Sequence, residues 1–266
     1  MFWFVLGIIG IFIGAFGTLI GAAGGFILVP ILFFLYPEDS PATITSITLT
    51  VAFFNALSGS IAYSRLKRID FRSGLIFAIT GIIGAIIGAN ITALLSRDIF
   101  QVIFGVVLLI AATYLMIRPV RINTSSHKTG HTKIQISDKQ GNSYSYSYSC
   151  PLGLIISLGV GFCSGLLGIG GGIIHVPLLT QILSFPVHIA TATSQLIISL
   201  TTLSAVITHI IAGVYTEGIR RAAVLSFGAI IGAQLGARIS SRVPAALVVR
   251  LLALGLIVVG IRLFFS

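Results

Sequence analysis

Gly21-Ala-Ala-Gly-Gly-Phe-Ile-Leu-Val-Pro-Ile-Leu32 recurs, with few changes, as Gly168-Ile-Gly-Gly-Gly-Ile-Ile-His-Val-Pro-Leu-Leu179. Two further blocks follow in the same order in each half: Ala42–Ser46 matches Ala190–Ser194, and Ile82–Ala89 matches Ile230–Ala237. Three matching blocks in the same order indicate that the chain arose by internal duplication.

The chain is hydrophobic from end to end. Of its 266 residues, 56% are apolar and 8% are charged, whereas a soluble domain has about 25% charged residues. Apolar runs long enough to cross a bilayer, about 20 residues each, recur throughout. Runs such as Ser73–Leu95 and Val243–Phe265 lack the alternation of membrane β-barrel strands. The composition therefore predicts an all-α protein of the lipid bilayer.

The sequence predicts five apolar segments in each half, and the first two of each half are separated by a glycine break. The first half contains Phe2–Ile20, Phe26–Tyr36, Ala42–Ser64, Ser73–Leu95 and Ile99–Ile117, with the break at Gly21–Gly25. The second half contains Pro151–Leu167, Ile173–Leu183, Ile189–Ala212, Arg221–Ala237 and Pro244–Phe265, with the break at Gly168–Gly172. Because five is odd, the second copy must enter the membrane upside down, which predicts two inverted repeats. The expected domains are an N-terminal repeat (1–118), a polar linker (119–150) and a C-terminal repeat (151–266).

The distribution of cations predicts the same topology, because cytoplasmic loops are enriched in Lys and Arg. If loops 65–72 and 118–150 are cytoplasmic, strict alternation also places 238–250 inside. Twelve of the 16 Lys and Arg residues then fall inside: Arg65, Lys67, Arg68, Arg72, Arg118, Arg121, Lys128, Lys133, Lys139, Arg238, Arg242 and Arg250. The prediction is a multi-pass protein of the cell inner membrane with a cytoplasmic linker.

The linker is polar and ends in the repetitive run Ser143–Ser149. It has too little apolar content to form a core, so we expect a flexible segment. His127 and His131 are four residues apart, but no further ligands cluster near them, so no metal site is predicted.

The glycine breaks are the predicted binding site. Glycine tolerates positive φ, so each break can stop one helix and start another. Unwound backbone at membrane depth is tolerated only where it is buried in protein or faces a wet cavity. The restarted helices would point free N–H groups and a positive dipole end at such a cavity, which suits an anion. The candidate residues are Gly24, Gly25, Gly170, Gly171 and Gly172.

Other glycines have a structural interpretation. Gly84 and Gly88, like Gly232 and Gly236, are four residues apart and share one helix face, a spacing typical of tight helix crossing.

Hydroxyl and amide side chains near each break are further candidate ligands: Thr45, Ser46, Thr193, Ser194 and Gln195. The alternative is that such Ser and Thr side chains only cap a helix or bond their own backbone. Asn55 and His209 are isolated polar residues inside predicted spans and are additional candidates. All six Asp and Glu residues lie in predicted loops, so an anionic substrate is easier to accommodate than a sodium site built from carboxylates.

The sequence argues against several other functions. The net charge of +10 comes from cations scattered over helix-flanking loops, which does not indicate nucleic-acid binding. The spans show no recognisable catalytic constellation, so no enzyme activity, catalytic residue or cofactor is predicted. Cys150 and Cys163 support neither a disulfide framework nor a zinc site.

The glycine-rich block at 168–179, its N-terminal copy and Ala190–Ser194 resemble the TauE/SafE family of membrane transporters, over nearly the whole chain outside the linker. The N-terminal copy departs from the pattern, because Ala22 and Ala23 replace one glycine of the triplet. The resemblance implies export or uptake of sulfite and organosulfonates. We therefore expect a secondary transporter that moves small anions by alternating access. An anion channel that uses the same helix termini is the alternative.

Overall fold

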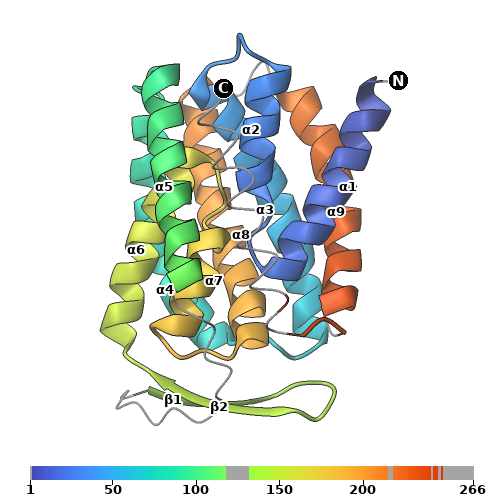
Figure 1. Ribbon diagram of the computed structural model, residues 1–266, viewed down its shortest axis with the longest axis vertical. Coiled ribbons are helices and arrows are strands. Elements are labelled where there is room, and N and C mark those ends of the chain that lie inside the picture. Colours follow the sequence, from blue (N-terminus) through green and yellow to red (C-terminus); the bar gives the residue numbers. More distant parts are fainter. Residues whose placement is uncertain (1, 118–131, 215–217, 241, 245–246, 248–266) are drawn as a thin grey trace.

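The computed structural model describes residues 2–117, 132–214, 218–240, 242–244 and 247 (Figure 1). Its first-half helices are α1 (Phe2–Ile20), α2 (Gly25–Leu35), α3 (Pro41–Arg65), α4 (Phe71–Thr92) and α5 (Arg97–Ile117). Its second-half helices are α6 (Cys150–Leu167), α7 (Gly172–Gln181), α8 (Val187–Ile211) and α9 (Ile219–Ser240). Six of these helices are long and apolar enough to cross a membrane. The predicted all-α membrane class is confirmed, whereas the predicted segment Pro244–Phe265 lies almost wholly outside the described residues.

Local sequence signals explain where the helices begin. The Ser40 hydroxyl accepts a hydrogen bond from Thr43 N–H at the start of α3, where Pro41 occupies the first turn. Asp70 caps α4 in the same way by accepting a hydrogen bond from Ser73 N–H. Each predicted segment that falls on described residues matches an observed helix to within a few residues.

The two halves pack against each other rather than folding separately. Helix α1 pairs with α9, α4 pairs with α6, and α3 and α8 pair with each other in the interior. A Cβ atom added to Gly84 would overlap the Leu158 carbonyl oxygen, and one added to Gly232 would overlap that of Ile11. The predicted packing role of these glycines is therefore confirmed, because only a glycine lets the neighbouring backbones approach this closely.

The described loops named below lie at the two ends that the predicted alternation assigns to them. At one end, Arg97 donates to the carbonyl oxygens of Phe33 and Pro37, and Arg221 pairs with Asp39. At the other end lie the 65–70 turn and a β-hairpin (Figure 1). Helix α1 starts at the end opposite the hairpin, whereas α6 starts at the hairpin (Figure 1). These directions are what an inverted repeat requires; the inverted symmetry and the side that faces the cytoplasm stay predictions.

The expectation of a flexible linker is wrong for residues 132–148. Strands β1 (Thr132–Ser137) and β2 (Ser143–Tyr148) form an antiparallel hairpin that lies across the end of the helix bundle (Figure 1). Tyr146 and Tyr148 are buried against Phe77 of α4 and Phe185 of the α7–α8 loop. The Ser-Tyr alternation therefore supplies one polar and one aromatic face, and the aromatic face supplements the core.

Asp70 connects the hairpin to two helices. Its carboxylate accepts hydrogen bonds from Ser73 and, at 2.7 Å, from the Tyr146 hydroxyl, and its N–H donates to Thr193 of α8. Burial, together with the neighbouring Asp70 carboxylate, raises the pKa of Tyr146, so its phenol remains a hydrogen-bond donor at physiological pH.

We expect Tyr146→Phe to loosen the hairpin by about 1.5–3 kcal/mol, the usual value of a hydrogen bond to a charged group. Hydrogen–deuterium exchange of the β1 and β2 amides measures this loss as faster exchange. Tyr144→Phe is the matched control, because the Tyr144 hydroxyl lies 3.5 Å from Asp138, too far for a strong bond. Equal exchange rates in the two variants would show that the hydrogen bond from Tyr146 to Asp70 does not hold the hairpin to the helices.

Candidate functional site

Both glycine breaks use left-handed backbone. In the first break φ is 77° at Gly21, 53° at Ala23 and 73° at Gly24. In the second break φ is 71° at Gly168, 74° at Gly170 and 73° at Gly171. Five of these six residues are glycines, which adopt such angles without steric cost, and Ala23 is the exception. All of these residues are buried.

The two breaks contact each other backbone to backbone. A Cβ atom on Gly25 would lie 2.7 Å from the Gly168 carbonyl oxygen. A Cβ atom on Gly172 would overlap the Gly21 carbonyl oxygen and lie 2.5 Å from Ala22 Cα. Gly25 and Gly172 therefore let the two breaks approach each other closely, and the second break lies directly against the first.

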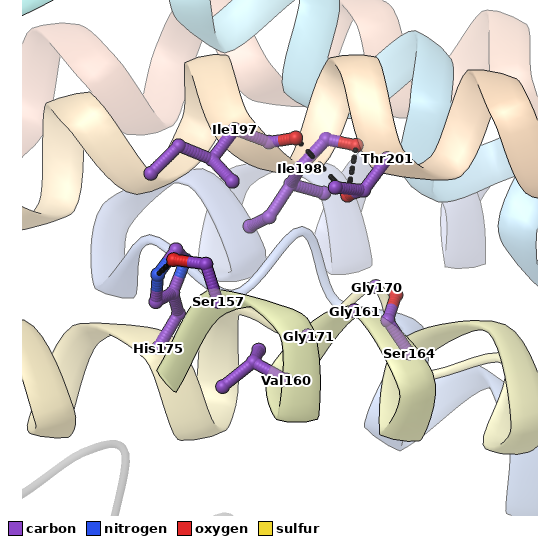
Figure 2. Close-up of a pocket in the computed structure, with 10 residues that line it drawn as sticks. All are labelled: Ser157, Val160, Gly161, Ser164, Gly170, Gly171, His175, Ile197, Ile198 and Thr201. Atoms are coloured by element: carbon purple, nitrogen blue, oxygen red, sulfur yellow. Dashed lines mark hydrogen bonds between the residues drawn. The ribbon is translucent and has the colours of Figure 1, made fainter. Parts of the chain in front are cut away.

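Helix α7 starts at the second break without a side-chain cap. Its first backbone bonds run from Ile174 and His175 N–H to the Gly171 carbonyl oxygen. The N–H groups of Gly172 and Ile173 come before these bonds and form the positive end of the helix dipole. Near this end lies a small cavity, shown in Figure 2.

The cavity lies between α6, α7 and α8. Its lining consists of Ser157, Val160, Gly161, Ser164, Gly170, Gly171, His175, Ile197, Ile198 and Thr201. Its free volume is about 10 Å³, on the order of one water molecule. A larger cavity of about 290 Å³ between α5, α6 and α7 has an almost wholly apolar lining, which offers an anion nothing to bind. The small cavity is the one with several polar side chains in its lining.

Three buried polar side chains give the small cavity its chemistry. The Ser157 hydroxyl lies 3.1 Å from His175 Nε2, and both side chains are almost inaccessible to solvent. The Ser164 hydroxyl is 1% exposed, lies beside the Gly170–Gly171 backbone and has no hydrogen-bond partner (Figure 2). A buried hydroxyl without a partner is costly. Ser164 is the one residue of the described cavity lining whose side chain is in this state.

Of the predicted site residues, the cavity includes only Gly170 and Gly171; Gly172 follows at the start of α7, while Gly24 and Gly25 lie in the first break. The predicted hydroxyls have other partners. Thr45 and Ser46 donate to the carbonyl oxygens of Ala42 and Thr43 in their own helix.

The three predicted residues of α8 connect it to other elements. The Thr193 hydroxyl accepts a hydrogen bond from Asp70 N–H, and the Ser194 hydroxyl donates to the Gly21 carbonyl oxygen at 3.1 Å. Gln195 Nε2 donates to the Gly17 carbonyl oxygen at 3.4 Å. Of the three, Ser194 bonds the first break directly. Whether any of them contacts a substrate stays a prediction.

The two additional candidates lie outside the cavity. Asn55 is fully buried and accepts a hydrogen bond from the Thr18 hydroxyl at 2.7 Å. His209 is buried near the end of α8, and its Nε2 atom has no hydrogen-bond partner.

Sequence reasoning missed Ser157, Ser164, His175 and Thr201. The spacing of Ser157, Gly161 and Ser164 places them on one face of α6, which was a usable signal. Nothing in the sequence, however, indicated that His175 of α7 would meet this face. Among the described residues, no group of three or more His, Cys, Asp or Glu side chains is arranged to hold a metal ion.

The family described as Sulfite exporter TauE/SafE matches residues 6–263, a range that includes both breaks and the whole cavity. The chain belongs to the TauE/SafE family of membrane transporters.

Its relatives carry the same general description. The probable membrane transporter protein YunE of Bacillus subtilis is 34% identical over 273 residues, which cover 100% of this chain and 98% of YunE. A probable membrane transporter protein of Methanocaldococcus jannaschii is 27% identical over 216 residues, which cover 79% of this chain and 73% of that protein. No solved structure matches this TauE/SafE chain.

Proposed function

We propose that this chain is a secondary transporter of the cell inner membrane that moves small anions, sulfite or organosulfonates, by alternating access. The observation that carries the proposal is the buried, unpartnered Ser164 hydroxyl beside the positive end of α7. The description of the matching family, which names sulfite export, supports this substrate class.

The donors around the cavity suit a sulfur oxyanion. Its oxygens accept hydrogen bonds, and Ser164, the N-terminal N–H groups of α7 and Ser157 supply donors from two helices. Because the free volume is about that of one water molecule, α6, α7 and α8 must separate to admit the anion. This conformation is then the closed one between two open states.

Transport into proteoliposomes tests the proposal directly. Labelled sulfite, thiosulfate, sulfoacetate and acetate are supplied with and without an imposed voltage. We expect saturable movement of the sulfur anions and none of acetate. Currents that rise with voltage without saturation would favour the anion channel, and movement of none of the four anions would overturn the substrate class.

Ser164→Ala is expected to weaken anion binding about 10- to 100-fold, since a hydrogen bond to a charged group contributes about 1.5–3 kcal/mol. The fold should not suffer, because this hydroxyl has no partner in the empty protein. Uptake kinetics and thermal unfolding of the same preparation separate the two effects. Ser226→Ala is the matched control: Ser226 is also buried with an unpartnered hydroxyl, but it lies on α9, away from the cavity. A similar loss of anion affinity in both variants would show that Ser164 does not bind the anion.

A further inference from the structure

One titratable side chain, His175, lines the cavity. The other polar groups of the described lining are the uncharged hydroxyls of Ser157, Ser164 and Thr201 and the backbone of the glycine break. Among the described lining residues there is no lysine, arginine or carboxylate. The site assigned above to an anion therefore has no permanent positive charge on a side chain.

The first repeat shows that this fold does not need a histidine here. Leu28 takes the place of His175 in the matching block and is fully buried. When the alignment is extended without a gap, Gly10 and Gly17 correspond to Ser157 and Ser164. The duplicated scaffold packs with apolar residues and glycines at these positions, so packing alone does not account for the polar set in the second repeat.

An anion in this cavity requires compensating charge. A charge buried without a partner is among the most expensive features in a protein interior. The end of α7 offers the equivalent of roughly half a positive charge, and hydroxyl groups offset a further part of the cost. A proton on His175 would supply the remainder, and neither charge would then be buried alone.

Protonation would also reorganise the hydrogen bonds. Both ring nitrogens of a protonated imidazole are donors, so Nε2 would donate to the Ser157 hydroxyl oxygen 3.1 Å away. The Ser157 proton is then free to point into the cavity, where it joins Ser164 as a second hydroxyl donor. One proton thus supplies both a charge and a donor.

No other described charged or titratable side chain lines the cavity beside His175. Helix α7 carries no other titratable residue, and the described ones on the helices packed against it lie outside the cavity lining: Cys150 and Cys163 on α6, His188 and His209 on α8, and Arg97 and Asp98 on α5. The proton is therefore assigned to His175 alone.

We propose that His175 takes up one proton together with each anion, so that the transporter moves its substrate as an anion–proton pair. This inference rests on the proposed function. Linkage makes the coupling reciprocal: acid tightens anion binding, and the anion favours protonation. One coupled proton changes the affinity by up to about tenfold per pH unit in the range where His175 titrates.

The test uses methanesulfonate, a sulfonate whose charge does not change between pH 5 and pH 8, so that any pH effect belongs to the protein. Labelled uptake into proteoliposomes is measured together with a luminal pH dye. We expect uptake to acidify the lumen and to be faster when the lumen is more alkaline than the medium. The KM for methanesulfonate should decrease as the pH is lowered. His175→Gln keeps a hydrogen-bonding group near Ser157 but cannot take up a proton, so any remaining uptake should be independent of pH.

Two further variants keep the result decisive. His209→Gln removes a second buried histidine outside the cavity and should leave the pH dependence unchanged. His175→Leu copies the first repeat and should fold but lose uptake. Saturable uptake by the unmodified chain without proton movement would overturn the coupling while the proposed function stands. Absence of uptake of any sulfur anion at every pH would overturn the proposed function itself, and loss of pH dependence in His209→Gln would overturn the assignment to His175.

Discussion

Gly172→Ala is expected to abolish transport and to leave little folded protein. The added methyl group would overlap the Gly21 carbonyl oxygen and lie 2.5 Å from Ala22 Cα, and both are backbone atoms that cannot rotate away. Overpacking usually costs about 1–3 kcal/mol, and a clash with fixed backbone falls at or above the upper end of that range. Size-exclusion chromatography of the detergent-extracted protein measures the folded fraction, and proteoliposome uptake measures the activity.

Gly159→Ala is the matched control for this substitution. Gly159 lies in α6, is exposed and has nothing within 4 Å of an added Cβ atom. Alanine should stabilise the helix there by about 0.5–1 kcal/mol. If Gly172→Ala were as well folded and as active as Gly159→Ala, the close contact between the two breaks would not be needed for folding or transport.

The helices were predictable because the length of an apolar run and the position of a glycine break are local properties of the sequence. The breaks at Gly21–Gly25 and Gly168–Gly172 end and restart helices where expected, and Gly84 and Gly232 contact neighbouring backbone as their spacing indicated. These features depend on residues close in sequence or on a repeated pattern. The helix breaks and the packing glycines could therefore be predicted from the sequence alone.

Composition and sequence period give opposite predictions for the linker, and the period is the one that matches the hairpin. The run Ser143–Ser149 alternates polar and aromatic residues, which is the period of a strand with one buried face. Its Tyr146 and Tyr148 side chains are buried only because α4 and the α7–α8 loop supply the facing aromatic rings. That surface is tertiary, and a segment considered alone does not reveal it.

The cavity was missed for a related reason. Thr45 and Ser46 carry the expected chemistry, but their hydroxyls bond their own helix, an alternative that local sequence cannot distinguish from ligand binding. Ser157 and His175 are unremarkable singly and become a site only when α6 and α7 meet. The asymmetry between the repeats, with His175 opposite Leu28 and the two serines opposite glycines once the alignment is extended, is the signal to use in similar chains.

Asp138→Ala is expected to release the hairpin from the helix bundle. Asp138 pairs with Arg68 at 3.3 Å, and both side chains are almost fully buried. Loss of the carboxylate would leave the guanidinium buried without its counter-charge, which costs about 3–5 kcal/mol. Trypsin cleavage after Lys139, identified by mass spectrometry, should rise steeply in this variant. The double variant Arg68→Met with Asp138→Ala should recover much of the protection, because the unpaired charge is gone.

The same ion pair predicts an acid-sensitive hairpin. Burial alone raises the pKa of Asp138, but hydrogen bonds from Asn142 and Gln140 and the Arg68 charge outweigh it and lower the pKa below the ordinary value. A lowered pKa in the folded state means that the stabilisation is complete above about pH 4 and is lost as the pH falls through the folded value. Cleavage by an acid-active protease should therefore increase below pH 4 in the unmodified chain and not in the double variant. Equal acid sensitivity of both proteins would show that another group holds the hairpin, with the Asp70–Tyr146 bond as the next to test.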